Sequence, residues 1–335
     1  MDFNETRQNL ITKISNIGSN TFDEVALEVF RFQVVFNPVY SKFVSLLGVE
    51  PSAINSIDQI PFLPISLFKN HQIKTGKWQE EAIFKSSGTT SQTTSQHFVR
   101  SLEWYNEISI KGFETQYSEK LENICILALL PSYLERSGSS LVHMAEQFIK
   151  KSNFSDSGFF LNDFEKLKNI LKKCVDEKIP TLLLGVSFAL IDFAEKYPID
   201  LKHVIVMETG GMKGRRKEIT RNELHEYLKN SFKTKSIHSE YGMTELLSQA
   251  YSKENGLFRS ISTMKVLTRE ITDPLKIERI GRPGAINIID LANIDSCSFI
   301  ATDDLGKVYP DGSFEVLGRL DASDIRGCNL LVANN

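Results

Sequence analysis

The strongest constraint on the fold is an alternation of strand-like and helix-like segments in the middle of the chain. Residues 124–130 (ICILALL) form a short continuous apolar run, which is typical of a strand buried on both faces. The same stretch of chain contains three further predicted strands, at residues 181–184, 203–207 and 236–238, and predicted helices at residues 163–177, 187–197 and 220–232. Strands alternating with helices of this length indicate an α/β fold with mainly parallel sheets flanked by helices.

The chain before and after this core has a different texture. Near the N-terminus, Thr21 and Glu24 form a capping-box pattern, and Asn37-Pro38 ends the helix that it predicts. The buried face of that helix is an apolar stripe of Phe22, Val25, Val29, Phe32 and Phe36. After residue 255 we predict short strands at 286–290, 298–301 and 313–317, with a hairpin turn at residues 309–312 (YPDG). The sequence thus divides into residues 1–80, an α/β core at 81–254, a small antiparallel β-rich part at 255–320, and a tail at 321–335.

Charge and cysteine content exclude several classes of function. The 335 residues carry a formal net charge of −3, which gives no electrostatic footprint for nucleic acid. The four cysteines lie far apart without C-x-x-C spacing, so a zinc site or a disulfide framework is not predicted, and a reducing compartment fits best. The N-terminus lacks a signal-peptide pattern, and no run approaches the roughly 18 apolar residues of a membrane span. We expect a cytoplasmic protein without a membrane span.

Residues 85–95 (KSSGTTSQTTS) form a loop rich in Ser and Thr around one Gly. Such a loop offers closely spaced backbone N–H groups and hydroxyls, which is a cradle for phosphate oxygens. The Walker A spacing is absent. Taken alone, the stretch is equally typical of a flexible linker.

Three more polar segments follow predicted strands. Residues 239–245 (SEYGMTE) combine an aromatic ring, a hydroxyl and a carboxylate before an apolar segment at 246–251 that we predict to start a helix. Residues 208–217 (ETGGMKGRRK) combine glycines with cations that suit phosphate, and residues 302–304 (TDD) precede 318–321 (GRLD). Each segment alone is more typical of a cap or a turn. Residues 239–245 follow a predicted parallel strand, and a loop at the carboxyl end of such a strand is where these sheets bind ligands.

Taken together, these motifs resemble the adenylate-forming superfamily of acyl-CoA ligases, luciferases and adenylation domains, over residues 84–327. The resemblance implies that ATP and Mg²⁺ are bound, with the core 81–254 binding nucleotide and acyl group. The Ser/Thr loop would hold the β- and γ-phosphates, Thr244 the α-phosphate, and Glu245 the Mg²⁺. The implied loop residues are Ser86, Ser87, Gly88, Thr89, Thr90 and Ser91; adenine would lie against Gly210, Gly211, Met212, Tyr241 and Gly242; and ribose would bind Asp303 and Arg319.

Two departures narrow the resemblance. The family's loop continues into a Lys that this chain lacks, and the family's mobile C-terminal domain with its adenylation lysine is expected to be missing. Lys213 and Arg215 are our candidates for the missing positive charge at the α-phosphate. The chain is similar in these respects to the acyl-protein synthetase branch, of LuxE type, which activates fatty acids. Residues 95–97 (SQH), 209–215 and 325–331 carry that similarity, and His97 is either a phosphate or carboxylate contact or a structural histidine.

That branch implies an acyl-enzyme on a cysteine near the C-terminus, and Cys328 is the candidate. Arg326 can lower its thiol pKa, and Gly327 gives the backbone freedom to move. Cys125 is expected in the core, and Cys174 is expected on a helix. The expected enzyme is an acid–thiol ligase that forms acyl-adenylate, acylates itself, and delivers the acyl group to an acyl reductase or an acyl carrier protein. The alternatives are an acyl-CoA ligase resembling phenylacetate-CoA ligases, a non-catalytic nucleotide-binding homologue, and for Cys328 an incidental tail cysteine.

Overall fold

The computed structural model describes residues 2–86, 94–131, 138–210 and 219–320. Its described residues form two compact units. The first unit comprises those within Met1–Leu102, Glu245–Ser248 and Ser262–Asn335, and the second those within Glu103–Thr244 and Gln249–Ile261. The four-part division made from the sequence remains a prediction.

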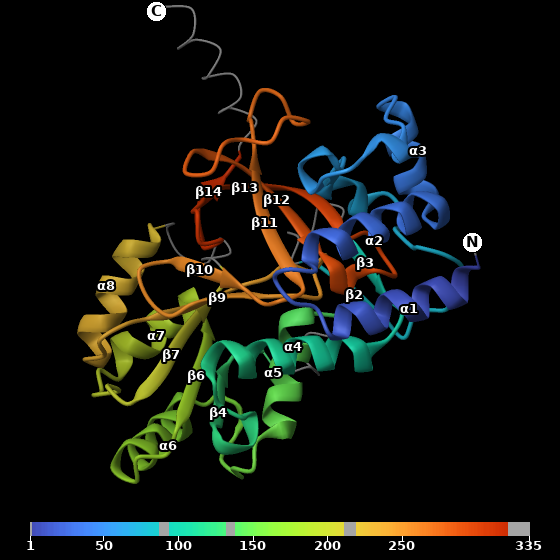
Figure 1. The fold of residues 1–335 in the computed structure, drawn as a ribbon. Coiled ribbons are helices and arrows are strands. Elements are labelled where there is room, and N and C mark those ends of the chain that lie inside the picture. Colours follow the sequence, from blue (N-terminus) through green and yellow to red (C-terminus); the bar gives the residue numbers. More distant parts are fainter. Residues whose placement is uncertain (1, 87–93, 132–137, 211–218, 321–335) are drawn as a thin grey trace, which may run out of the picture. The chain divides into compact units, whose positions relative to one another are not determined.

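The second unit is an α/β sandwich around one sheet. Its strands run in the order β10-β9-β8-β7-β6-β4-β5, with β5 to β8 parallel and β9 and β10 antiparallel. Figure 1 shows α4 and α5 on one side of the sheet and α6, α7 and α8 on the other. The strands are β4 (Cys125–Leu129), β5 (Gly158–Phe159), β6 (Thr181–Val186), β7 (Val204–Thr209), β8 (His238–Tyr241), β9 (Ala250–Ser252) and β10 (Leu257–Ser260). The helices are α4 (Leu102–Tyr117), α5 (Ser140–Lys151), α6 (Phe164–Asp176), α7 (Ser187–Lys196) and α8 (Arg221–Phe232).

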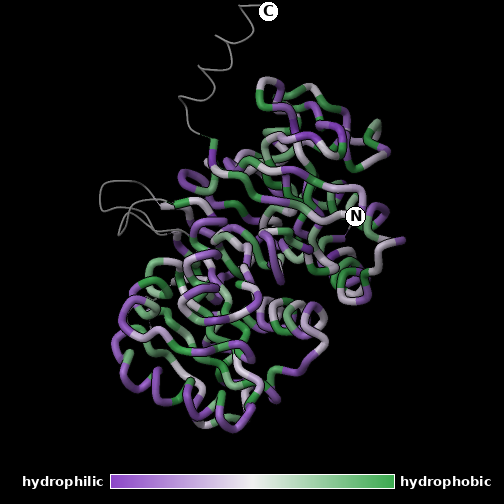
Figure 2. The backbone as a smooth tube through the Cα atoms, turned by 90° about the vertical axis from the view of Figure 1, so that its left-hand side faces the viewer, coloured by the Kyte–Doolittle hydropathy of each residue, from purple (hydrophilic) through white to green (hydrophobic). Residues whose placement is uncertain are grey.

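The sequence patterns explain these elements. Every residue of β4 and β6 is buried, as expected for parallel strands covered on both faces by helices. Thr220 caps α8, because its hydroxyl accepts from Glu223 N while the Glu223 carboxylate accepts from Thr220 N. In Figure 2 hydrophilic residues follow the outer helices of this unit and hydrophobic residues follow its strands. The predicted α/β alternation is confirmed.

The first unit contains an antiparallel sheet in the order β11-β12-β13-β14, with β1 parallel to β13, and a separate β2–β3 hairpin. Its strands are β1 (Leu63–Pro64), β2 (Ala82–Lys85), β3 (Gln96–Val99), β11 (Met264–Arg269), β12 (Pro283–Asp290), β13 (Phe299–Val308) and β14 (Phe314–Arg319). Its helices are α1 (Phe3–Ser15), α2 (Phe22–Phe36) and α3 (Pro38–Leu46). Short 3-10 helices in the two units span Pro51–Ala53, Ile57–Gln59, Ile65–Lys69, Leu121–Asn123 and Leu291–Asn293.

Helix α2 forms the core of the first unit together with the sheet. The Phe30 ring lies edge-on to Phe299 of β13 at 6.0 Å, and most of the predicted stripe is buried. Asn37 ends α2 and caps α3 by accepting from Tyr40 N, so the predicted end at Asn37-Pro38 is confirmed. The predicted hairpin is also confirmed, since β13 and β14 are antiparallel and Gly312 has the positive φ of 78° that its turn requires.

Two local predictions are wrong. The capping box at Thr21 does not form, because the Thr21 hydroxyl bonds Gly18 and makes no cap bond to α2. Residues 246–251 start no helix; they lead into β9, and the amides of Leu247 and Ser248 donate to Asp290 instead of to a helical turn. Within the described ranges, no helix combines the length and the apolar character needed to cross a membrane.

Candidate functional site

The Ser/Thr loop connects strands β2 and β3 of the first unit, and Ser86 and Ser95, at its two ends, are hydrogen-bonded to each other and form its base. Ser86 N donates to Ser95 O at 3.1 Å, and Ser95 N donates to Ser86 Oγ at 3.0 Å. Lys85 pairs with Gln96 at the end of the ladder. The predicted phosphate-binding residues Ser87, Gly88, Thr89, Thr90 and Ser91 lie outside the described residues. The described part of the loop is therefore a hairpin whose two ends are bonded to each other.

Glu245 lies beside this base, in the same unit. Glu245 is 5% exposed, and its carboxylate accepts a hydrogen bond from the hydroxyl of Ser95, which is also buried. Burial raises the pKa of the Glu245 carboxyl, while the Ser95 hydrogen bond and the charges of Arg319 and Lys69 act in the opposite direction. A buried carboxylate within the field of two cations, next to a hydroxyl-rich loop, is suited to bind a cation together with phosphate.

Arg319 and the two aspartates of the TDD segment lie on paired strands. Asp304 is opposite Arg319 in the β13–β14 register, and Arg319 Nε donates to Asp304 Oδ1 at 3.4 Å. The predicted ribose ligand Asp303 is exposed, and its carbonyl accepts from Leu320 N at 2.7 Å. The structure thus brings Arg319 and the TDD segment together, with the direct ion pair to Asp304 rather than to Asp303.

In the second unit, the predicted adenine and phosphate residues follow β7 and β8. Tyr241 ends β8 with its ring 5.8 Å from Phe258 and is 8% exposed. An ideal Cβ on Gly242 would lie 2.5 Å from Glu240 Oε1, so only a glycine leaves room for that carboxylate. Thr244 is half-buried.

The neighbouring strand β7 ends in a buried polar cluster. Thr209 Oγ1 donates to Glu240 Oε2 at 2.5 Å, and Ser187 Oγ donates to the Gly210 carbonyl at 2.7 Å. Gly210 has a φ of 66°, a left-handed conformation that favours glycine. The remaining predicted residues of this segment, Gly211, Met212, Lys213 and Arg215, lie outside the described residues.

The donor set fits Mg²⁺ bound mainly through a nucleotide. No group of three or more His, Cys, Asp or Glu side chains capable of holding a metal occurs within the part of the chain that the structure describes. Mg²⁺ commonly uses one or two carboxylates and completes its shell with phosphate oxygens and waters. The single buried Glu245 carboxylate beside Ser95 meets that requirement.

The described cysteines and His97 have structural surroundings. Cys125, Cys174 and Cys297 are all buried, which confirms the core placement expected for the first. His97 is buried in β3 with its ring edge-on to Phe68 at 6.2 Å, an arrangement that favours the structural interpretation. Cys328 lies outside the described residues.

Sequence reasoning missed several residues around Glu245: Lys69, Ser95, Asp290 and Asn293. Ser95 was recognised as part of the Ser/Thr stretch, but the sequence does not show that it lies next to Glu245 in the fold. Asn293 donates to the Glu245 carbonyl at 2.8 Å across a separation of 48 residues, and no local pattern signals such a contact.

Two solved structures resemble the fold of this chain. The fold resembles an open conformation of 2-hydroxyisobutyryl-CoA ligase in complex with 2-HIB-AMP and CoA, with a TM-score of 0.65 and 12% identity over 91% of this chain and 76% of that chain. It also resembles ATP-bound MatB from Rhodopseudomonas palustris, with a TM-score of 0.53 and 15% identity over 75% of this chain and 49% of that chain. The chain therefore spans about half the length of the MatB structures that it matches.

These likenesses show the fold of adenylate-forming enzymes. No curated protein matches the chain by sequence. A protein family described as "Acyl-protein synthetase, LuxE" matches residues 15–335, which is nearly the whole chain. This chain belongs to the LuxE acyl-protein synthetase family.

Proposed function

We propose that this protein uses ATP to activate a carboxylic acid, in particular a fatty acid, as its acyl-adenylate, and transfers the acyl group to a protein thiol. The observation that carries the proposal is the buried Glu245 carboxylate bonded to Ser95 at the closed base of the Ser/Thr loop. An oxygen ligand beside a phosphate-binding loop is the arrangement that a metal–nucleotide complex requires. Family membership, together with ATP in the MatB structure and 2-HIB-AMP in the ligase structure, supports the same chemistry.

In the first half-reaction, a carboxylate oxygen of the acid attacks the α-phosphorus of ATP. The bond from that phosphorus to the α,β-bridging oxygen breaks, and pyrophosphate leaves with the bonding electron pair. Ser86 and the loop residues bind the β- and γ-phosphates, Thr244 binds the α-phosphate, and Glu245 holds Mg²⁺. The metal supplies neutralisation of phosphate charge. The protein contributes mainly positioning and fixed donors for the charge that develops.

Gly210 and Tyr241, with Gly211, Met212 and Gly242, border adenine, and the left-handed Gly210 lets the backbone come close to a flat ring. Asp303 and Arg319 bind the ribose hydroxyls. The Arg319 side chain is 77% exposed, so it can leave its long contact with Asp304 at little cost.

In the second half-reaction, the thiolate of Cys328 attacks the acyl carbon of the adenylate. A carbon–sulfur bond forms, the carbon–oxygen bond to AMP breaks, and AMP leaves; the thiol proton has been lost to solvent. Lys213 and Arg215 stabilise the charge at the α-phosphate. The acylated protein delivers its acyl group to a partner such as an acyl reductase or an acyl carrier protein. The reaction takes place in the cytoplasm, where the acceptor thiol stays reduced.

Two assays test the proposal. ATP–pyrophosphate exchange, screened across carboxylic acids of increasing chain length, should respond to a fatty acid; no exchange with any acid would favour a nucleotide-binding homologue without activity. Radiolabelled acid with ATP should leave a thiol-labile label on the protein, which Cys328→Ser should abolish while exchange continues. Label retained in Cys328→Ser would overturn that assignment. Efficient consumption of the adenylate by CoA in the same variant would identify an acyl-CoA ligase instead.

A further inference from the structure

The backbone amides of Leu247 and Ser248 are held by one buried carboxylate. Asp290, at the end of β12, is fully buried and accepts from Leu247 N at 2.8 Å and Ser248 N at 3.0 Å. It also accepts from Ser248 Oγ at 2.5 Å and from Ala292 N at 3.1 Å. Burial raises the pKa of the Asp290 carboxyl, and these donors oppose the rise. Asp290 therefore accepts hydrogen bonds from the backbone of residues 247, 248 and 292 and from the Ser248 hydroxyl.

Asn293 links the same segment to Glu245 itself. Its Nδ2 donates to the Glu245 carbonyl at 2.8 Å and to Asp290 Oδ2 at 3.2 Å. Asn293 is 1% exposed, and its Oδ1 has no hydrogen-bond partner among the described residues. A buried oxygen without a hydrogen-bond partner destabilises the folded state. The role of the Asn293 side chain therefore lies in the two groups that its amide nitrogen binds, rather than in its own contribution to stability.

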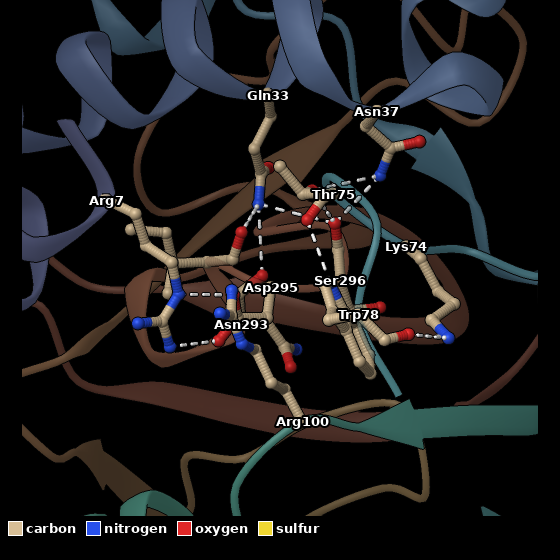
Figure 3. A network of polar contacts seen from close by, with 11 residues as sticks. Arg7, Gln33, Asn37, Lys74, Thr75, Trp78, Arg100, Asn293, Asp295 and Ser296 are labelled. Atoms are coloured by element: carbon tan, nitrogen blue, oxygen red, sulfur yellow. Dashed lines mark hydrogen bonds and ion pairs between the residues drawn. The ribbon is translucent and has the colours of Figure 1, made fainter. Parts of the chain in front are cut away.

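The connection from β12 to β13, residues 290–298, is in turn anchored to helix α2. Gln33 Nε2 donates to the carbonyls of Asn293 at 3.0 Å and Ile294 at 3.1 Å, and Gln33 Oε1 accepts from Ser298 N at 2.9 Å. Asn37 Nδ2 donates to the Ser296 carbonyl at 2.8 Å. Figure 3 shows these α2 side chains reaching down onto the connection. The anchor of Glu245 thus rests on the core of the first unit rather than on a surface loop.

We propose that Asp290 and Asn293 are positioning residues for the adenylation reaction: they hold the backbone of residues 245–248 so that the Glu245 carboxylate faces Ser95 at the base of the Ser/Thr loop. This inference rests on the proposed function, because Glu245 is taken as the Mg²⁺ ligand. Both side chains act through the backbone of residues 245–248. Partners that orient a metal ligand typically change metal affinity about 10- to 100-fold when they are removed.

The test uses Asp290→Asn and Asn293→Leu in the full chain, with Asp295→Asn as the matched control. Asp295 lies on the same connection and is also buried, but its carboxylate pairs with Arg7 at 2.6 Å and with Arg100 at 3.2 Å (Figure 3). All three variants lose a buried polar interaction. Only the first two lose contact with the segment that carries Glu245.

In ATP–pyrophosphate exchange, the apparent affinity for Mg²⁺ should fall about 10- to 100-fold in Asp290→Asn and Asn293→Leu. The KM for the acid should stay within about twofold of wild type, and Asp295→Asn should keep the wild-type Mg²⁺ dependence. Exchange that falls only in proportion to the folded fraction, with unchanged Mg²⁺ dependence, would show a purely structural role and overturn the inference.

A second readout is independent of activity. Hydrogen exchange at the Leu247 and Ser248 amides should become at least about tenfold faster in Asp290→Asn, and stay as in wild type in Asp295→Asn, because Asp290 accepts both amides. Unchanged protection in a folded Asp290→Asn protein would refute the positioning role whatever the activity. If wild-type protein shows no exchange of pyrophosphate, the proposed function fails, and the amide data still decide whether Asp290 holds this segment.

Discussion

Glu208 offers a sharp test of how the carboxyl end of β7 is held. Its carboxylate is 4% exposed and lies 3.5 Å from both His225 Nε2 and Arg221 Nε of α8, while Ser187 Oγ donates to it at 3.2 Å. Burial raises the pKa of Glu208, but the hydrogen bonds from His225 and Ser239 and the Arg221 charge outweigh it, so that the pKa lies below its ordinary value. Glu208→Gln keeps the shape and removes the charge.

The expected cost follows from this geometry. Removing one partner of a buried ion pair costs about 3–5 kcal/mol. Here both contacts are long and the Arg221 side chain is 29% exposed, so we expect about 2–3 kcal/mol. A loss of that size lowers the Tm of a chain of 335 residues by about 3–4 °C. Because the folded-state pKa is depressed, the stabilisation is present above the unfolded-state pKa of about 4.3 and is lost as pH falls through the folded-state pKa.

Thermal unfolding followed by circular dichroism at pH 7 measures the loss in Tm. Chemical unfolding between pH 3 and pH 7 measures how the free energy of unfolding depends on pH, because this range includes the unfolded-state pKa of about 4.3. The control is Glu226→Gln on the same helix, whose side chain is 65% exposed beside Lys229 and should be nearly silent. Equal unfolding temperatures of Glu208→Gln and Glu226→Gln at pH 7 would refute a stabilising role of the Glu208 charge. A difference between Glu208→Gln and wild type that persists unchanged at acidic pH would refute it as well.

Three further predictions concern the nucleotide. Glu245→Gln should lower pyrophosphate exchange about 100-fold at limiting Mg²⁺. In wild type, burial raises the pKa of Glu245, so exchange should fall as the pH decreases, with a midpoint above the ordinary range for Glu. A pH profile of kcat/KM measures this midpoint. Gly242→Ala should raise the KM for ATP without a comparable change for the acid, because its Cβ displaces the Glu240 carboxylate from Thr209. Lys69→Met should raise the KM for ATP severalfold and Lys69→Arg should restore it, since the Lys69 charge acts on Glu245; equal KM values for both variants would exclude that role.

The fold was predictable where local pattern and burial point the same way. The apolar run at residues 124–130 became β4 because helices cover both faces of its sheet, and Thr220 caps α8 as its spacing indicates. Thr21 has the same Ser/Thr-x-x-Glu spacing and fails, since its hydroxyl bonds Gly18. The pattern is necessary for a capping box, and the backbone conformation at the cap decides whether it forms.

The candidate site was predictable only as a set of motifs. Glu245 and Arg319 could be selected from their surroundings in the sequence, whereas Ser95 could be assigned as a partner of Glu245 only after folding. Residues 246–251 show the same limit: their apolar pattern suits a helix, but Asp290, more than forty residues later, takes the amides of Leu247 and Ser248. A side chain that far along the chain leaves no trace in a local window.

The surroundings of Glu245 also bear on the lysine that the Ser/Thr loop lacks. In the described part of the first unit, two cations act on the Glu245 carboxylate: Lys69, from a 3-10 helix before the hairpin, and Arg319, at the end of β14. Both side chains are exposed, so their charge can shift towards phosphate without breaking a buried contact. For the proposed nucleotide, positive charge is thus available from a different stretch of chain than the loop itself. In the positioning role proposed above, the Asp290 carboxylate and the Asn293 amide hold the backbone that carries this carboxylate, through Leu247 N, Ser248 N and the Glu245 carbonyl.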